Sequence, residues 1–338
     1  MVTYTASLAN HHDPEYIVES VPVIDQELSY DNFFVGDERL NRNTYALLAL
    51  AAEHSEDLGL GTGVTNPYTR HPAMTAAAIA TIDRLSDGRA HLGLGGGSPI
   101  ALDPLGYDQD DPIGTVRDAV KIIRPLLNGE RASVDRKEFI LDDADLDVEP
   151  VSEVPIYVAG RGPHILGLGG FRGDGVIAGA GLASVDGMEF AMNHIEKGAS
   201  KADRSVSEID VVCWAFLSVA EDRDTALDGV NSLVARIVNK APLPALEAIG
   251  IDPDLAKDVK AIDDVTELSA AALREHVPRS VTEQFAIAGT PDECRDHVAR
   301  LREFGVDHIG LLAFENDEHD ELGSLRQFSE HVIDERDE

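Results

Sequence analysis

Short apolar segments alternate with helical segments along almost the whole chain, and this alternation limits the possible folds more than any other feature. Continuous apolar strands separated by helices are typical of parallel sheets that are covered on both faces. Eight strand–helix units in one chain favour an α/β fold of the closed (β/α)8 TIM barrel type, with an open doubly wound sheet as the alternative. The segments predicted as strands are 3–9, 32–37, 57–64, 90–95, 155–159, 175–178, 209–220 and 308–314.

Local signals help to divide the chain. The run from Thr290 to Glu293 has the pattern of a capping box with proline in the first turn, and Gly305 stands where that helix should end. Residues 130–149 are acidic and are expected to be irregular. Residues 241–288 contain several prolines and short helical patches, so they are predicted to be an insertion before the last helix–strand unit. With no repeat and no linker, residues 1–338 are expected to form one barrel domain.

The chain carries 62 acidic and 28 basic residues, which gives a net charge of −34. Such a surface repels nucleic acids and anionic membranes, so neither is expected as a partner. The acidic residues are spread along the chain, which favours a halophilic protein that works in very high salt. No segment approaches the roughly 20 apolar residues of a membrane span, and the N-terminus lacks a secretory pattern, so a cytoplasmic protein is expected.

Glycine-rich runs follow three predicted strands, at the end where (β/α)8 barrels carry their functional groups. Glycine lets a backbone approach a ligand closely, so two adjacent runs predict a wall for a flat ring, with tight turns as the alternative. The third run leads into a helix N-terminus, which is a candidate phosphate site. None fits the dinucleotide fingerprint, which disfavours a Rossmann NAD site. The candidate cofactor-binding residues here are Gly61, Gly63, Val64, Thr65, Gly95, Gly96, Gly97, Ser98, Gly160, Arg161 and Gly162.

Titratable side chains follow the first two predicted strands. His11 and His12 come after the first strand, and Asp37 and Glu38 come after the second. Adjacent residues on an extended strand point to opposite faces, so at most one histidine is expected to face the barrel mouth. No spacing typical of a metal site involves them, and no metal is expected. The candidate catalytic residues, as proton donors or substrate contacts, are His12, Asp37 and Glu38.

Two runs in the third and fourth strand–helix units resemble a known family. They are Gly61-Thr-Gly-Val-Thr-Asn-Pro-Tyr-Thr-Arg-His-Pro72 and Ala80-Thr-Ile-Asp-Arg-Leu-Ser-Asp-Gly-Arg-Ala-His-Leu-Gly-Leu-Gly95. They are similar to the luciferase-like F420-dependent oxidoreductases, and within these most similar to methylenetetrahydromethanopterin reductase. Matching segments at 105–106, 115–119, 126–130, 155–163 and 289–293 extend the resemblance over nearly the whole chain.

The resemblance implies a (β/α)8 barrel with an insertion, often a homodimer, that holds the deazaflavin coenzyme F420 at its mouth. It implies a cis peptide bond between Gly63 and Val64, in a bulge that supports the deazaflavin ring. It places the phosphate side of the cofactor at residues 160–163, with Ile177 and Ala178 on the next strand beside it. The implied activity is hydride transfer between the deazaflavin and a small organic substrate, such as a methylene-tetrahydropterin.

Three positions depart from the reductases. Ser7 stands where they carry glutamate, Ser98 where they carry aspartate, and Glu38 where they carry histidine. A serine hydroxyl does not titrate near neutral pH and cannot replace a carboxylic acid as proton donor. Either another group, such as His12 or Glu38, supplies the proton, or the substrate is not a methylene-pterin. The alternatives are an FMN-dependent luciferase-like monooxygenase and an F420-binding protein without turnover.

Overall fold

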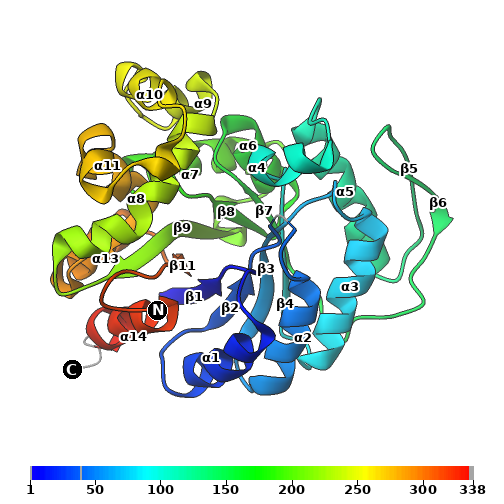
Figure 1. The fold of residues 1–338 in the computed structure, drawn as a ribbon. Helices are drawn as coiled ribbons and strands as arrows, with labels where there is room; N and C mark the ends of the chain where they lie inside the picture. Colours follow the sequence, from blue (N-terminus) through cyan, green and yellow to red (C-terminus); the bar gives the residue numbers. More distant parts are fainter. Residues whose placement is uncertain (1, 39, 335–338) are drawn as a thin grey trace.

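A closed parallel barrel with helices on its outside forms the body of the protein (Figure 1). The computed structural model describes residues 2–38 and 40–334, so the domain expected over 1–338 includes some residues outside this part. Among the described residues, eight barrel strands pair in the order β1-β2-β3-β4-β7-β8-β9-β11, and β11 pairs with β1 to close the ring. The predicted (β/α)8 barrel is therefore confirmed. The strands are β1 (Thr3–Leu8), β2 (Asn32–Val35), β3 (Gly59–Thr65), β4 (Ala90–Gly95), β7 (Ile156–Gly160), β8 (Gly175–Ala178), β9 (Asp210–Val219) and β11 (His308–Ala313).

The outer helices begin at the local signals that the sequence carries. Several have proline in the first turn, and the predicted capping box at Thr290 is present with Glu293 as its partner. Gly305 ends that helix in the left-handed region, with φ of 109°. The helices are α1 (Pro14–Gln26), α2 (Thr44–His54), α3 (Pro72–Leu85), α4 (Pro99–Leu102), α5 (Pro112–Leu127), α6 (Pro163–Arg172), α7 (Val185–Ser200), α8 (Arg223–Lys240), α13 (Pro291–Phe304) and α14 (Glu321–Phe328).

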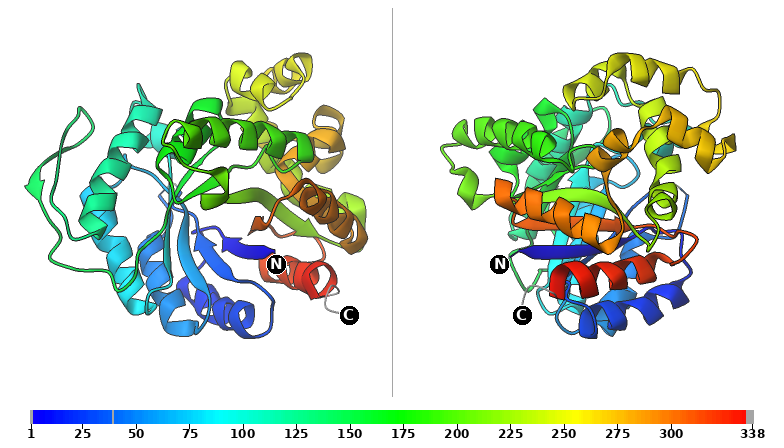
Figure 2. Two further views of the ribbon diagram at one scale, coloured as in Figure 1. Left: turned by 180° about the vertical axis from the view of Figure 1, so that it is seen from behind. Right: turned by 90° about the vertical axis from the view of Figure 1, so that its left-hand side faces the viewer.

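The acidic segment expected to be irregular contains an antiparallel hairpin of β5 (Ala132–Asp135) and β6 (Ile140–Ala144). The hairpin projects from the barrel beyond α3 and α5 (Figures 1 and 2). Arg136 ties it to the body through an ion pair of 2.6 Å with Asp118 on α5. The expectation was wrong because both strands are largely exposed, so they lack the apolar alternation that marks a half-buried strand.

The predicted insertion is mostly helical, but its last residues belong to the sheet. It forms α9 (Leu243–Ala248), α10 (Pro253–Lys260), α11 (Ala270–His276) and α12 (Arg279–Phe285), and then β10 (Ala286–Gly289). Residues 210–213 of β9 pair with β8, and residues 216–219 pair with β10. The helices α9, α10 and α11 lie together at one side of the barrel, in the upper left of Figure 1.

The barrel interior is polar near the N-terminal ends of the strands and aromatic above. Nε2 of His308 lies 2.8 Å from Oγ1 of Thr5, and its Nδ1 lies 2.8 Å from Oδ2 of Asp210. Above this layer the rings of Phe34 and Trp214 stack with centroids 6.3 Å apart. These side chains fill the lower barrel, so a ligand site is confined to the C-terminal mouth.

Candidate active site

The glycine runs of β3 and β4 meet at the mouth of the barrel. The peptide bond between Gly63 and Val64 is cis, as the resemblance implies. The pairing of β3 with β4 shifts register between Thr62 and Thr65, which places a bulge at the end of β3. Because all the barrel strands are parallel, this bulge lies at the same mouth as the ends of the other strands.

Some glycines of these strands are required for close packing inside the barrel, and not only for a surface that a ligand could contact. A Cβ atom on Gly61 would lie 2.6 Å from the Phe34 ring, and one on Gly63 would lie 2.8 Å from the Trp214 ring. The side chain of Val64 covers the end of β4, because a Cβ atom on Gly95 would lie 3.1 Å from its Cγ2. Gly61 therefore lies below the site, and the wall consists of Val64 and the surrounding backbone.

The loop after β4 is fixed by the side chain of Gln109, which was not predicted from the sequence. The Gln109 amide donates hydrogen bonds to the carbonyl oxygens of Gly96, at 2.6 Å, and Gly97, at 3.2 Å. Gly97 has φ of +76°, a backbone conformation that favours glycine. Gly96 has no such requirement, because a Cβ atom there would lie 3.5 Å from the nearest atom, an ordinary contact distance. The carbonyl of Ser98 accepts a bond from Leu102 N, so Ser98 starts the short helix α4.

The turn between β7 and α6 has the properties of an anion site. Gly162 is the N-cap of α6 and provides no side-chain cap. Pro163 at the first helical position has no N–H, so the backbone amides that stay available in the first turn begin at His164. Nη1 of Arg161 is buried without a hydrogen-bond partner among the described residues, and burial lowers the pKa of this guanidinium. Gly160 pairs with Ala178, and Ile177 and Ala178 are buried beside the turn. A phosphate or carboxylate group fits these donors.

Two adjacent carboxylates that follow β2 have different surroundings. Oδ2 of Asp37 accepts a 2.7 Å hydrogen bond from the hydroxyl of Thr65, which directly follows the β3 bulge. Asp37 is half-buried, whereas Glu38 is exposed. The backbone carbonyl of Glu38 accepts a 3.1 Å hydrogen bond from the amide of Asn10. Of these two predicted catalytic residues, only Asp37 lies against the predicted cofactor wall.

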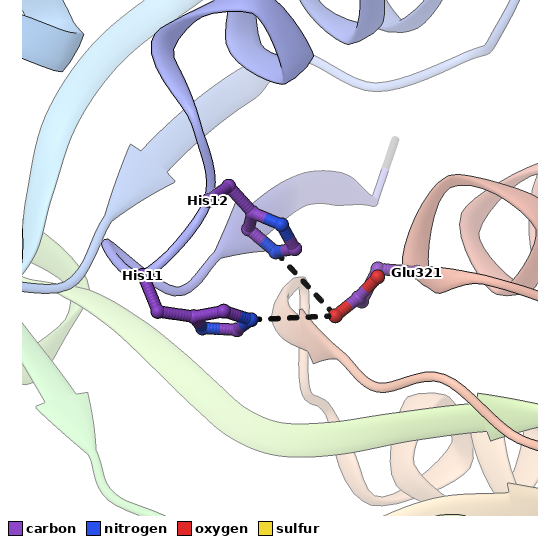
Figure 3. A group of neighbouring side chains, drawn as sticks. All are labelled: His11, His12 and Glu321. Atoms are coloured by element: carbon purple, nitrogen blue, oxygen red, sulfur yellow. Dashed lines mark ion pairs between the residues drawn. The ribbon is translucent and has the colours of Figure 1, made fainter.

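His11 and His12 both face Glu321 (Figure 3). The expectation that they point to opposite faces was wrong, because β1 ends at Leu8 and the histidines lie in a turn. Nε2 of His12 is 3.4 Å and Nε2 of His11 is 4.0 Å from Oε1 of Glu321. The ring of His12 also stacks on Tyr16, with centroids 4.4 Å apart.

Burial and charge set the pKa values in this group. Burial, together with the neighbouring His12, lowers the pKa of His11. Burial tends to raise the pKa of Glu321, but the nearby His12 and the backbone at the start of α14 hold it below its usual value. Glu321 did not stand out in the sequence, since it lies in a segment crowded with acidic residues.

Ser7 occupies the inner face of β1 two residues beyond Thr5, which contacts His308 on the neighbouring strand β11. Its Oγ is buried and has no hydrogen-bond partner among the described residues. Buried hydroxyls nearly always have a partner, so this atom is suited to a polar group of a bound ligand.

None of the helices that the structure describes is both long and apolar enough to span a membrane.

The sequence matches the family model described as luciferase-like monooxygenase over residues 2–308. It is 33% identical over 297 residues to the 5,10-methylenetetrahydromethanopterin reductase of Methanolobus tindarius, covering 88% of this chain and 90% of that protein. It is 28% identical over 323 residues to the F420-dependent glucose-6-phosphate dehydrogenase of Beutenbergia cavernae, covering 92% and 90%. Among solved structures, the coenzyme F420 dependent tetrahydromethanopterin reductase of Methanopyrus kandleri aligns over 98% of both chains, with a TM-score of 0.84 and 28% identity.

Proposed function

Because the chain belongs to the luciferase-like monooxygenase family, and is an F420-dependent oxidoreductase within it, we propose that it transfers a hydride between F420 and a small organic substrate. The observation that carries the proposal is the wall of Val64 and bare backbone at the ends of β3 and β4. When bound, F420 supplies two-electron hydride chemistry, and the protein orients the reactants and excludes water.

The residues present fit a flat ring that carries an anionic tail. Val64 and the backbone of β3 support one face of the ring, and the loop at Gly96 borders it. Arg161 and the first amides of α6 bind the phosphate side, where an unpaired guanidinium is already buried. Ile177 and Ala178 form the apolar floor beside this turn.

We assign proton transfer to Asp37, since it is fixed by Thr65 beside the wall. Glu38 is exposed, and His12 faces Glu321, so each is a weaker candidate. Ser7 provides a hydroxyl that can hydrogen-bond a substrate but cannot supply the acid that the related reductases carry there.

A methylene-tetrahydropterin is the first substrate to test, because a relative that is 33% identical over most of both chains is a methylenetetrahydromethanopterin reductase. Ser7 and Ser98 argue for a second class of substrate, such as a secondary alcohol or a sugar phosphate. A substrate of that class gives up a hydride and needs a base rather than an acid, which suits a carboxylate.

The test is a titration of the purified full chain with F420 and with FMN, followed by turnover assays with both substrate classes. We expect F420 to bind at least about tenfold more tightly than FMN. Gly63→Val should weaken F420 binding by about tenfold or more. Even a Cβ atom at this position would lie 2.8 Å from the Trp214 ring, so the larger side chain should displace the bulge that supports the cofactor ring. Gly167→Ala, inside α6 and outside the proposed site, is the matched control, since its Cβ atom would lie 3.6 Å from the carbonyl oxygen of His194, an ordinary contact distance.

Three outcomes decide the proposal. Unchanged F420 affinity in a folded Gly63→Val variant rejects the site. Tighter binding of FMN than of F420 favours the monooxygenase alternative. Tight F420 binding without hydride transfer to or from any substrate of either class identifies an F420-binding protein without turnover.

A further inference from the structure

Three side chains with metal-binding chemistry converge at the rim of the barrel mouth (Figure 3). His11 and His12 lie in the loop after β1, and Glu321 lies in the first turn of α14, after β11. One ligand atom from each residue lies within 4.8 Å of the other two. The two loops meet because β1 pairs with β11 and closes the barrel, so distant parts of the sequence build one group.

An ion pair between the histidines and Glu321 does not account for all the polar atoms of this group. Nε2 of His12 is buried and has no hydrogen-bond partner among the described residues, although Oε1 of Glu321 is only 3.4 Å away. The same carboxylate oxygen also faces Nε2 of His11. Because the ring of His12 lies between His11 and Tyr16, at centroid distances of 4.1 Å and 4.4 Å, its direction is fixed. A cation between these atoms would satisfy both imidazole nitrogens and the carboxylate.

The distances are close to those that a transition metal requires. A tetrahedral zinc ion with bonds of about 2.0 to 2.1 Å separates its ligand atoms by about 3.3 Å. The nitrogens of His12 and His11 lie 3.4 Å and 4.0 Å from Oε1 of Glu321, so small side-chain rotations complete the site. Two imidazoles and one carboxylate form a common set of ligands for zinc and similar ions, whereas Mg²⁺ and Ca²⁺ prefer oxygen.

Access to the site is also suitable. The side chain of His11 is 56% exposed, whereas those of His12 and Glu321 are each 11% exposed. An ion can therefore enter from the side of His11, and a fourth coordination position there stays open to water. From the sequence no metal was expected, because the two histidines have no spacing typical of a metal site and were assumed to point to opposite faces of a strand.

We propose that His11, His12 and Glu321 bind one divalent transition-metal ion of the zinc class. This site is separate from the hydride-transfer wall and does not depend on F420. It adds to the proposed function a metal centre on the same mouth of the barrel.

The test is a titration of the metal-free full chain with Co²⁺, in a large excess of Mg²⁺ to occupy non-specific sites on the acidic surface. We expect one Co²⁺ per chain with a visible absorption band, displaced by one equivalent of Zn²⁺. X-ray absorption of the zinc form should give two imidazole nitrogens and one carboxylate oxygen at about 2.0 to 2.2 Å. Binding should weaken more than about tenfold in each of His11→Ala, His12→Ala and Glu321→Gln.

The controls are His276→Ala and Glu303→Gln, which change exposed residues outside the group and should bind Co²⁺ like the unaltered protein. Because His11 is exposed, His11→Ala tests the site even if the variants of the two buried residues fail to fold. Absence of a saturable Co²⁺ band overturns the proposal. So does a band that persists in folded His11→Ala. F420 affinity, measured with and without zinc, reports separately on the proposed function.

Discussion

The hydroxyl of Thr65 donates a 2.7 Å hydrogen bond to Oδ2 of Asp37, and so connects the end of β3 to the end of β2. Thr65 directly follows the bulge that carries Val64, so one hydrogen bond fixes the carboxylate relative to the proposed cofactor wall. The side chain of the adjacent Glu38 makes no such hydrogen bond to a described residue and is exposed. The pair provides a matched comparison of two neighbouring carboxylates.

Asp37→Asn should lower kcat by about 100- to 10,000-fold while F420 affinity changes less than about threefold, since only proton transfer is removed. Glu38→Gln is the control and should retain kcat within about threefold. Steady-state kinetics and F420 titration measure both quantities. Equal losses of kcat in the two variants would contradict the assignment.

Arg161→Met should weaken F420 binding by about tenfold or more, because it removes the unpaired guanidinium at the phosphate side. The free energy of unfolding should stay the same or rise, since a buried charge without a partner is unfavourable in the ligand-free protein. Arg84→Met, at an exposed position of α3, should change neither property. F420 titration and urea unfolding test this; a loss of stability with unchanged affinity would show that Arg161 serves the fold instead.

The stability of the protein should fall in mild acid because of His91. Burial, followed by the effect of His308, lowers the pKa of His91 to about 4 in the folded chain. In the unfolded chain this imidazole takes up its proton near pH 6.5. Between these values the unfolded state binds more protons, so the free energy of unfolding decreases as the pH falls, by up to about 3 kcal/mol.

Urea unfolding between pH 4 and 7 measures this dependence. The charged groups that act on His91 are His308, Asp210 and Asp83, and they remain in a His91→Gln variant. That variant should show a slope shallower by up to about 1.4 kcal/mol per pH unit. Identical slopes in the two proteins would assign the acid sensitivity to other groups.

Salt should stabilise the fold, because the net charge of −34 opposes the compact state. The screening length falls from about 10 Å at 0.1 M salt to about 3 Å at 1 M. We expect the free energy of unfolding in urea to rise between these KCl concentrations and to keep rising above them. Sucrose, which does not screen charge, is the control. Equal stability at low and at multi-molar KCl would refute the halophilic prediction.

The barrel itself was predictable because its strands are buried almost throughout, so that short, mostly apolar segments alternate with helices along the chain. The ends of β3 and β4 were predictable because glycine is rare in strands unless packing or close approach requires it. The hairpin β5–β6 was missed because neither face is apolar. The strand β10 was missed because it has only four residues, three of them small, and directly follows a helix.

The group at the rim could not be predicted, since it depends on tertiary contact. The contact between Glu321 and His12 requires β11 to pair with β1, and no local sequence pattern near either residue predicts this contact. Gln109 was missed for a similar reason, because its amide acts on the carbonyls of a loop that precedes it in the sequence. The histidine pair was misread because the end of β1 was placed beyond Leu8.

The pairing of β9 with two successive partners has an evolutionary consequence. The chain leaves β9 through α8, forms α9 to α12, and returns as β10 along the last residues of the same strand. Both ends of this excursion are thus anchored to one rigid element beside the mouth. The helices between those anchors can be exchanged, lengthened or shortened during evolution, and this would change the shape of the entrance to the barrel. The pairing of the eight barrel strands would stay the same.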